Sequence, residues 1–227
     1  MKRLLTTASL TALLASPLAL AAPETDEARL GYSLGVTLGQ SIQQDVGNLD
    51  VDAFTQAIQD VFAGDELAMS DEEMAEALMR FQEEAMATRQ AESDQLAEHN
   101  RAEGEAYLAA NAESEGVEVT DSGLQYRVLE AGDGATPGAE DSVEVHYEGT
   151  LIDGTVFDSS FERGEPVSFR VNQVIDGWQE ALQLMSVGDV WEIVIPAELG
   201  YGAQGQGPIG PNETLIFRVE LLDVTSD

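Results

Sequence analysis

The sequence predicts an α+β protein: an all-α N-terminal dimerisation domain with a long stalk helix, then a C-terminal antiparallel β-sheet wrapped on a short helix. Two observations lead to this prediction. Residues 24–112 contain no proline, and their apolar side chains recur at helical spacing. From Gly116 onward apolar and polar residues alternate, and turns rich in Gly and Pro separate the runs. We therefore expect two domains, at residues 22–112 and 113–227.

The first 21 residues have the pattern of a signal peptide. Lys2 and Arg3 precede an apolar stretch at residues 4–20, and Ala19-Leu20-Ala21 offers small residues at a cleavage site. A buried helix or a membrane span is the alternative, but the basic start and the small-residue end favour export. The absence of cysteine excludes a bacterial lipid anchor, and no later segment reaches about 18 consecutive apolar residues. We expect residues 1–21 to be removed and the protein to be periplasmic, with outer-membrane association left open.

The composition excludes several classes of function. The chain has 43 acidic and 10 basic residues, a net charge of −33. Without Lys2 and Arg3, 8 basic residues stand against the same 43 acidic ones, a charge of −35. Such a surface repels a phosphate backbone, so a nucleic-acid partner is excluded, as is an anionic membrane. With no cysteine there is no disulfide framework, thiolate nucleophile or cysteine-based metal site.

The first helical segment carries two parallel strips. Apolar residues recur at positions 30, 34, 38 and 42, before Gly47 ends the segment, and glycines recur beside them at positions 31, 35 and 39. A glycine in a helix interior costs about 1 kcal/mol, so three in register indicate that another backbone packs closely there. That backbone belongs either to a second chain or to the same one. We expect a homodimer formed through residues 24–86.

Two further helices follow in the N-terminal half. The second spans about residues 51–62, with Asp50 as its N-cap and Gly64 as its terminator. The third, about residues 70–110, begins with a capping box and would span roughly 60 Å at 1.5 Å per residue. Between residues 87 and 106 it is polar nearly all round, which is typical of a stalk rather than a core element. The segment has too little apolar surface to fold alone securely, which again favours dimerisation.

The C-terminal half reads as strands with one helix. The alternating runs that predict strands are residues 124–128, 143–147, 167–171, 191–195 and 216–221. A helical segment at residues 174–185 interrupts them, with its apolar residues on one side. An antiparallel sheet packed on a short helix is the arrangement that this order predicts.

Most catalytic constellations are missing from this half. The two histidines, His99 and His146, are isolated, and there is no Ser-His-Asp context, phosphate loop, metal cluster or Asp-x-Asp-x-Asp-Gly calcium loop. We therefore expect neither a metal ion nor a cofactor. What remains is a set of aromatic residues that either converge on one apolar pocket beside Asp158 or form ordinary core. They are Tyr147, Phe157, Trp178, Tyr201 and Phe217.

Motifs in a fixed order carry a family resemblance. They are residues 143–149 (VEVHYEG), 154–160 (GTVFDSS), 174–178 (VIDGW), 196–202 (PAELGYG) and 211–217 (PNETLIF). Together they resemble the signature of the FKBP-type peptidyl-prolyl cis-trans isomerases. The helical half, with YSLG at residues 32–35, resembles the exported subfamily of the macrophage infectivity potentiator, whose members are V-shaped dimers joined through N-terminal helices.

The resemblance implies an enzyme, a site and partners. The enzyme would rotate X–Pro bonds and so assist the folding of exported proteins. Its partners would be Pro-containing unfolded or partly folded chains and FKBP-directed macrolide inhibitors. The implied catalytic residues are Tyr147, Phe157, Asp158, Val174, Ile175, Trp178, Tyr201 and Phe217, and the implied substrate-binding residues are Val167 and Ile209.

Within this implied site each residue has an expected part. The prolyl ring would lie over Trp178, and the Ile175 N–H and the Tyr201 hydroxyl would donate to substrate carbonyls. Asp158 would orient the Tyr147 hydroxyl, and Ile209 would cover the site.

Two departures from the family pattern bear on activity. Val167 stands where many members have an aromatic residue, so one pocket wall would be smaller. The loop at residues 203–210 is rich in Gly and Gln and lacks a bulky tip, which favours a broad substrate range. The alternative function is a dimeric periplasmic holdase chaperone, whose pocket binds Pro-containing chains with little catalysis.

The acidic residues are spread over both halves rather than gathered in one block, which favours a solvated acidic surface over a binding patch. Our hypothesis is that this surface is halophilic, an adaptation to a saline exterior, because salt screens repulsion among like charges. The midpoint of thermal unfolding should rise as NaCl is added. A midpoint that does not depend on salt would rule the hypothesis out.

Overall fold

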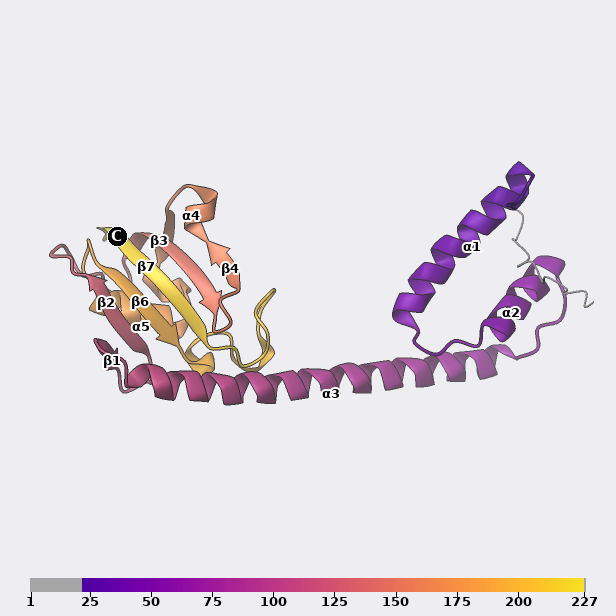
Figure 1. Cartoon of the computed structure of the whole chain (residues 1–227), viewed down its shortest axis with the longest axis horizontal. Helices are drawn as coiled ribbons and strands as arrows, with labels where there is room; N and C mark the ends of the chain where they lie inside the picture. The colour runs from indigo at the N-terminus through magenta and orange to yellow at the C-terminus, as the bar shows by residue number, and fades with distance from the viewer. Residues whose placement is uncertain (1–21, 227) are drawn as a thin grey trace, which may run out of the picture. The chain divides into compact units, whose positions relative to one another are not determined.

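The computed structural model describes residues 22–226, so the predicted signal peptide at 1–21 lies outside the described residues. The described chain forms two compact units, one ending at Met74 and the other beginning at Ala75. The first unit holds α1 (Asp26–Asp45) and α2 (Val51–Ala63), drawn in indigo and violet in Figure 1. The boundary predicted at residue 112 separates a dimerisation domain from an isomerase domain. It is a division by function, which the division into compact units does not test, so it stays a prediction.

The two helices of the first unit begin and end as local sequence dictates. The Asp50 side chain accepts a hydrogen bond from the Ala53 N–H at 2.9 Å and caps α2, as predicted. Gly64 ends α2 in the left-handed region at φ 73°, where glycine has no steric penalty. Neither α1 nor α2 contains a buried residue. Instead their apolar side chains line an open groove of about 860 Å³, which includes Leu34, Leu38 and Ile58.

The third helix, α3 (Asp71–Ala112), begins at the predicted capping box. The Ser70 N–H donates to Glu73 at 2.9 Å, and the Glu73 N–H donates back to the Ser70 hydroxyl at 3.3 Å. The structure corrects one part of the stalk prediction, because Asn100 and Gly104 are buried against the C-terminal unit. Hydropathy cannot show this, since the contact is made by an amide and a glycine rather than by an apolar stripe.

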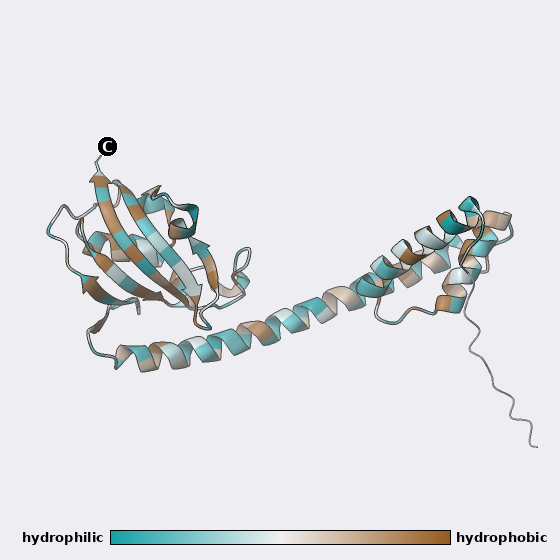
Figure 2. Ribbon diagram, turned by 45° about the horizontal axis from the view of Figure 1, so that its top comes forward, coloured by the Kyte–Doolittle hydropathy of each residue, from teal (hydrophilic) through white to brown (hydrophobic). Residues whose placement is uncertain are grey.

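The C-terminal unit contains one antiparallel sheet in the order β1-β2-β6-β7-β3-β4, with β5 also pairing with β3. Its strands are β1 (Val117–Val119), β2 (Gln125–Glu130), β3 (Ser142–Leu151), β4 (Val156–Ser159), β5 (Val167–Arg170), β6 (Val190–Ile195) and β7 (Leu215–Thr225). Strands β3 and β7 are the longest, and they pair along nearly their whole length. Buried and less buried residues alternate along both, so one face of the sheet forms the core. Figure 2 shows this alternation as brown and teal bands along the strands.

The core lies between this face and α5 (Asp176–Leu184). A Cβ added to Gly177 would lie 2.6 Å from the Ile195 side chain, so the missing side chain lets α5 approach β6 closely. Trp178 and Leu182 of the helix are buried against strand residues such as Val145. The short helix α4 (Ser160–Arg163) follows β4, and 3-10 turns lie at Val171–Gln173, Ala197–Leu199 and Gly202–Gln204. The predicted α+β fold is confirmed.

Of the helices in residues 22–226, none combines the length and hydropathy required to span a bilayer.

Candidate active site

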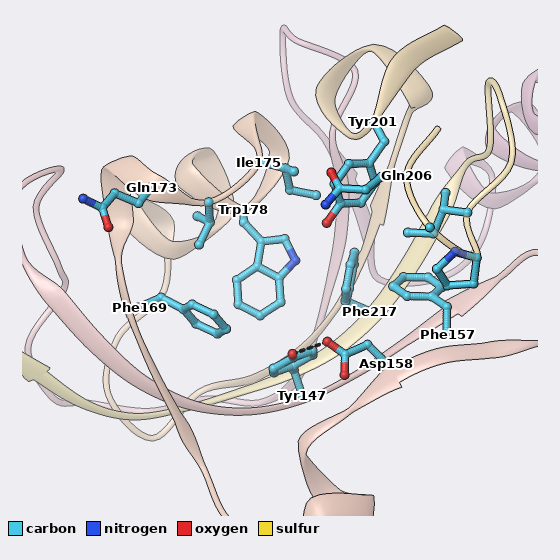
Figure 3. Close-up of a pocket in the computed structure, with 14 residues that line it drawn as sticks. Tyr147, Phe157, Asp158, Phe169, Gln173, Ile175, Trp178, Tyr201, Gln206 and Phe217 are labelled. Carbon is cyan, nitrogen blue, oxygen red and sulfur yellow. Dashed lines mark hydrogen bonds between the residues drawn. The ribbon is translucent and has the colours of Figure 1, made fainter. Parts of the chain in front are cut away.

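A pocket of about 690 Å³ opens where α5, the sheet and the loop after β6 meet (Figure 3). It brings together nine of the ten residues predicted for the site. The residues that line it are Tyr147, Phe157, Asp158, Phe169, Gln173, Val174, Ile175, Trp178, Tyr201, Gln206, Gly207, Pro208, Ile209 and Phe217. These residues come from segments that are far apart in the sequence, so the pocket exists only in the folded unit.

Aromatic rings packed edge-to-face form the floor of the pocket. Trp178 is 4% exposed, and its ring meets those of Tyr147 and Phe217 edge-on, each with centroids 5.3 Å apart. Phe169 packs edge-on against the same indole at 5.9 Å, and Phe157 against Phe217 at 5.4 Å. Edge-to-face pairs at these distances are favourable beyond the area they bury, so the rings hold one another in place. The result is a rigid apolar floor.

A glycine in β3 makes room for these rings. Gly149 lies opposite Phe217 in the β3–β7 register and opposite Asp158 in the β3–β4 register. A Cβ at this position would lie 2.6 Å from the Phe157 ring and 2.7 Å from the Phe217 ring. Any side chain at position 149 would therefore push the two rings apart or bend the strand.

The one carboxylate in the pocket is fixed by two donors. The Tyr147 hydroxyl donates to Asp158 Oδ2, as the dashed line in Figure 3 marks, and Arg163 Nη1 donates to Asp158 Oδ1. Arg163 also donates from Nη2 to the Tyr147 hydroxyl at 3.0 Å, and its guanidinium lies 5.6 Å from the centre of that ring. The three side chains form a closed triangle at the pocket wall.

The triangle sets the charge states of its members. Burial would raise the pKa of Asp158, but hydrogen bonds from Tyr147 and Arg163, together with the charge of Arg163, hold that pKa below its ordinary value. Burial and the hydrogen bond to Asp158 raise the pKa of Tyr147. At neutral pH a carboxylate therefore faces a neutral phenol, and the hydrogen bond that the carboxylate accepts orients the phenol hydroxyl.

Several donors in the pocket remain without acceptors. Within the described residues the Tyr201 hydroxyl makes no hydrogen bond, and burial together with the charge of Asp158 raises its pKa, so it stays protonated. The buried Trp178 Nε1 likewise lacks a partner in residues 22–226. Ile175 is the N-cap residue of α5: its carbonyl accepts from the Trp178 and Gln179 N–H groups, whereas its own N–H donates to no acceptor in residues 22–226. Such a pocket suits a ligand that has apolar rings and carbonyl acceptors.

The sequence pattern does not single out Arg163 as a site residue. It was one arginine among eight after the leader, with nothing to single it out. The signal lies in the turn that follows Asp158: Ser159 caps α4 by accepting from the Glu162 N–H, and Gly164 ends the helix at φ 77°. A single helical turn between a cap and a glycine brings the residue five positions after Asp158 back to it.

Val167 is the one predicted residue that does not line the pocket. It is partly buried and pairs with Val145, whereas Phe169, two positions further along β5, forms the wall. Both residues lie on the same face of the strand because side chains alternate with a period of two, so the alternation makes Phe169 as good a candidate for this wall as Val167. The pocket therefore keeps an aromatic wall on this side. Gln173 and Gln206 were also missed as lining residues.

The triangle leads to a prediction about pH. Replacing Arg163 with Met removes a donor and a positive charge, so the pKa of Asp158 should rise, since the burial that opposes ionisation remains. The lowered pKa stabilises the fold above the unfolded carboxyl value of about 3.9, and this contribution is lost as pH falls through the folded value. Acidification should therefore lower the free energy of unfolding of the Arg163→Met variant by less than it lowers that of the parent chain. Carbon NMR titration of the Asp158 carboxyl measures the pKa directly.

The matched control is Arg89→Met, which makes the same change of charge on the exposed part of α3. It should leave the Asp158 titration where it is in the parent chain. An Asp158 pKa that is equal in the Arg163 variant and in the parent would show that the triangle does not control this carboxylate.

Comparisons with known proteins agree with this geometry. The family described as FKBP-type peptidyl-prolyl cis-trans isomerase matches residues 134–222, and the domain amino terminal to it matches residues 27–128. The chain is 48% identical to the outer membrane protein MIP of Legionella longbeachae over 201 residues, which cover 88% of this chain and 86% of that protein. It is 46% identical to the FKBP-type 22 kDa peptidyl-prolyl cis-trans isomerase of Escherichia coli, covering 88% of this chain and 97% of that protein.

A solved structure extends the match to the fold. The crystal structure of FkpA from Escherichia coli superposes with a TM-score of 0.78 at 40% identity, over 90% of this chain and 99% of that one. Similarity at this level over nearly the whole length exceeds what a shared fold alone would give. This chain belongs to the FKBP-type peptidyl-prolyl cis-trans isomerases.

Proposed function

We propose that this isomerase acts outside the cytoplasm on X–Pro bonds of unfolded or partly folded polypeptides, and so assists the folding of exported proteins. The observation that carries the proposal is the pocket itself: a buried indole framed by aromatic edges, beside donors that have no acceptor in the described chain.

The chemistry needs no nucleophile. Rotation about an X–Pro bond faces a barrier of about 18–20 kcal/mol because the amide loses its resonance. The twisted amide is less charge-separated than the planar one, so an apolar pocket favours the transition state over the ground state. A floor of packed rings that excludes water provides such a medium. Every kilocalorie of this difference lowers the barrier, and about 1.4 kcal/mol gives a tenfold gain in rate.

Each lining residue that the sequence predicted has a part in this proposal. The prolyl ring lies on the Trp178 indole, with Val174 and Phe217 at its sides. The Ile175 N–H and the Tyr201 hydroxyl donate to carbonyls of the substrate on either side of the twisting bond. Such donors fix the flanking chain while the prolyl amide rotates.

The remaining lining residues shape the surroundings of the twisting bond. Asp158 orients the Tyr147 hydroxyl and sets the local field, and Phe157 closes the side of the pocket next to it. Ile209, which is 7% exposed, covers the site from the loop. FKBP-directed macrolides compete for the same floor.

Two substitutions test these parts. Tyr201→Phe removes one donor and should lower kcat/KM by roughly 2- to 10-fold, the range of a single hydrogen bond. Asp158→Ala leaves Tyr147 without its acceptor and should lower kcat/KM further while the thermal unfolding curve stays cooperative. Wild-type turnover in both variants would exclude this pocket as the site.

The reaction is best followed in a protease-free assay on a short Pro-containing peptide, with and without a macrolide. We expect catalysis that the macrolide abolishes. The holdase alternative predicts no turnover, together with suppressed aggregation of a proline-poor client, a result that would overturn the proposal.

A homodimer is the second part of the proposal, formed by the groove of α1 and α2. A Cβ added to Gly31, Gly35 or Gly39 would meet nothing within 4 Å in the described chain, so no intrachain backbone uses the glycine strip. Phe62 is 88% exposed and also lines the groove. A second copy of the same helices offers apolar side chains to fill the groove and a backbone to pack on the glycines.

The dimer is tested by light scattering on the full chain. Leu34→Glu places a charge in the groove and should give a monomer at micromolar concentration, because burying an unpaired carboxylate is unfavourable. Gln44→Glu adds the same charge to an exposed position of α1 outside the groove lining and should stay dimeric. A parent chain that is monomeric would contradict the proposal.

The location of the protein and its domain organisation are the third part of the proposal. The relative from Legionella longbeachae is named an outer membrane protein, which supports a location beyond the inner membrane for this chain as well. We assign residues 1–21 to the signal peptide, 22–112 to dimerisation and 113–227 to isomerisation. Fractionation of cells expressing the full chain separates a free periplasmic protein from one held at the outer membrane.

A further inference from the structure

Helix α3 contacts the end of the loop that lies over the pocket. Asn100 of α3 is 6% exposed and uses its amide group to donate to the Pro211 carbonyl at 2.9 Å and to Glu213 Oε1 at 3.0 Å. One turn further along the helix is Gly104, where a Cβ would collide with the Thr214 side chain. The helix therefore lies directly against residues 211–214, at the end of the loop that bears Ile209.

The loop also donates a hydrogen bond to α3. The Asn212 side chain donates from Nδ2 to the Ala97 carbonyl of α3 at 3.2 Å. Asn212 is the one non-glycine residue in the described chain with a positive φ, at 54°. Asparagine tolerates this region better than other side chains, so the loop keeps a demanding backbone conformation where it meets the helix.

A short chain of hydrogen bonds links this junction to the pocket wall. The Asn212 N–H donates to the Gly202 carbonyl at 2.9 Å, which ties the end of the loop to the residue after Tyr201. Within the loop Gln206 and Ile209 exchange main-chain hydrogen bonds at 2.9 and 3.0 Å. Tyr201, Gln206 and Ile209 all line the pocket.

Glu213, which accepts from Asn100, lies in an environment that disfavours its negative charge. Burial, together with the nearby charges of Asp153 and Glu103, raises the pKa of Glu213, and only His99 acts in the opposite direction. A partly buried carboxyl in an acidic neighbourhood requires a donor, and Asn100 supplies one at either protonation state. Without that amide, both Glu213 and the Pro211 carbonyl lose a partner at the root of the loop.

We propose that Asn100, together with Asn212, is a positioning residue of the isomerase: it fixes the loop of residues 200–213 so that Tyr201, Gln206 and Ile209 form the pocket wall. The pocket floor is built by the sheet and α5 and does not need this contact. The contact of Asn100 and Asn212 between α3 and the loop therefore governs how the loop wall holds the substrate. It also makes the last third of α3 a part of the catalytic unit rather than a spacer.

The test uses the full chain and a short Pro-containing peptide, and Asn100→Ala is compared with the matched control Asn111→Ala. Asn111 also lies in the last third of α3, and its Nδ2 donates to Gln125 Oε1 of β2 at 2.8 Å, away from the loop. Asn100→Ala removes two hydrogen bonds from the helix to the loop, and Asn111→Ala removes one from the helix to β2. Asn100→Ala should raise KM about tenfold with kcat changed less than about twofold, whereas Asn111→Ala should leave both within about twofold.

Hydrogen exchange gives a readout that does not depend on turnover. In Asn100→Ala the Gln206 and Ile209 amides should exchange faster, while those of β6 and β7 keep their protection. Asn212→Gly keeps the positive φ accessible and removes only the bond to Ala97, so it should reproduce the rise in KM even if the alanine variant at position 100 is too unstable to assay.

The inference rests on isomerase activity, so the parent chain is assayed first. An inactive parent would contradict the proposed function. An active parent with unchanged KM in Asn100→Ala and Asn212→Gly, or with equal losses in Asn100→Ala and Asn111→Ala, would overturn the positioning role alone.

Discussion

The close approach of α5 to the sheet is the constraint on which the rest of the structure depends. It requires that two positions carry no side chain: Gly177, which faces Ile195 of β6, and Gly149, which makes room for Phe157 and Phe217. With glycine at both positions, Trp178 is almost fully buried between α5 and the sheet, and four aromatic rings pack edge-on against it or against one another. The same packing that forms the core thus leaves a rigid apolar floor at one end of it. A larger residue at position 177 would separate α5 from the sheet, and one at position 149 would push apart the rings of Phe157 and Phe217, so either change would remove the floor.

Hydrogen bonds fix both the positions and the charge states of the polar side chains beside this floor. Tyr147 and Arg163 both donate to Asp158 and keep its pKa low, so the charge is fixed before a substrate arrives. Preorganised charges of this kind need no rearrangement during the reaction. Above the floor the wall is a loop, and loops are more mobile than the elements they connect. The amides at positions 100 and 212 supply the restraint that the loop lacks, and they attach it to the helix instead of to the sheet. Substrate binding then depends on both the aromatic floor and the loop wall.

Much of this architecture follows from the sequence. The change of apolar period separates helices from strands, and local rules gave the cap at Asp50, the capping box at Ser70 and the terminator at Gly64. The family motifs contain eight of the nine predicted residues that line the pocket, and the ninth, Ile209, lies in the loop between two of them. What escaped prediction depends on the folded chain. Arg163 reaches Asp158 only through the turn of α4. Phe169 shares a strand face with Val167, and period alone cannot tell which of the two reaches the pocket. Asn100 sits in a polar stretch whose burial no hydropathy pattern reveals.

The central claim is that the pocket accelerates rotation by surrounding the amide with an apolar medium, without proton transfer. The most direct test measures the cis–trans exchange rate of a short Pro-containing peptide by NMR exchange spectroscopy, with the parent chain in H₂O and in D₂O. Rotation in a water-excluding pocket involves no proton in flight, so the ratio of the two catalysed rates should be about one. A ratio of about two or more would mean that a proton moves in the rate-limiting step, and this account of the pocket would then be wrong.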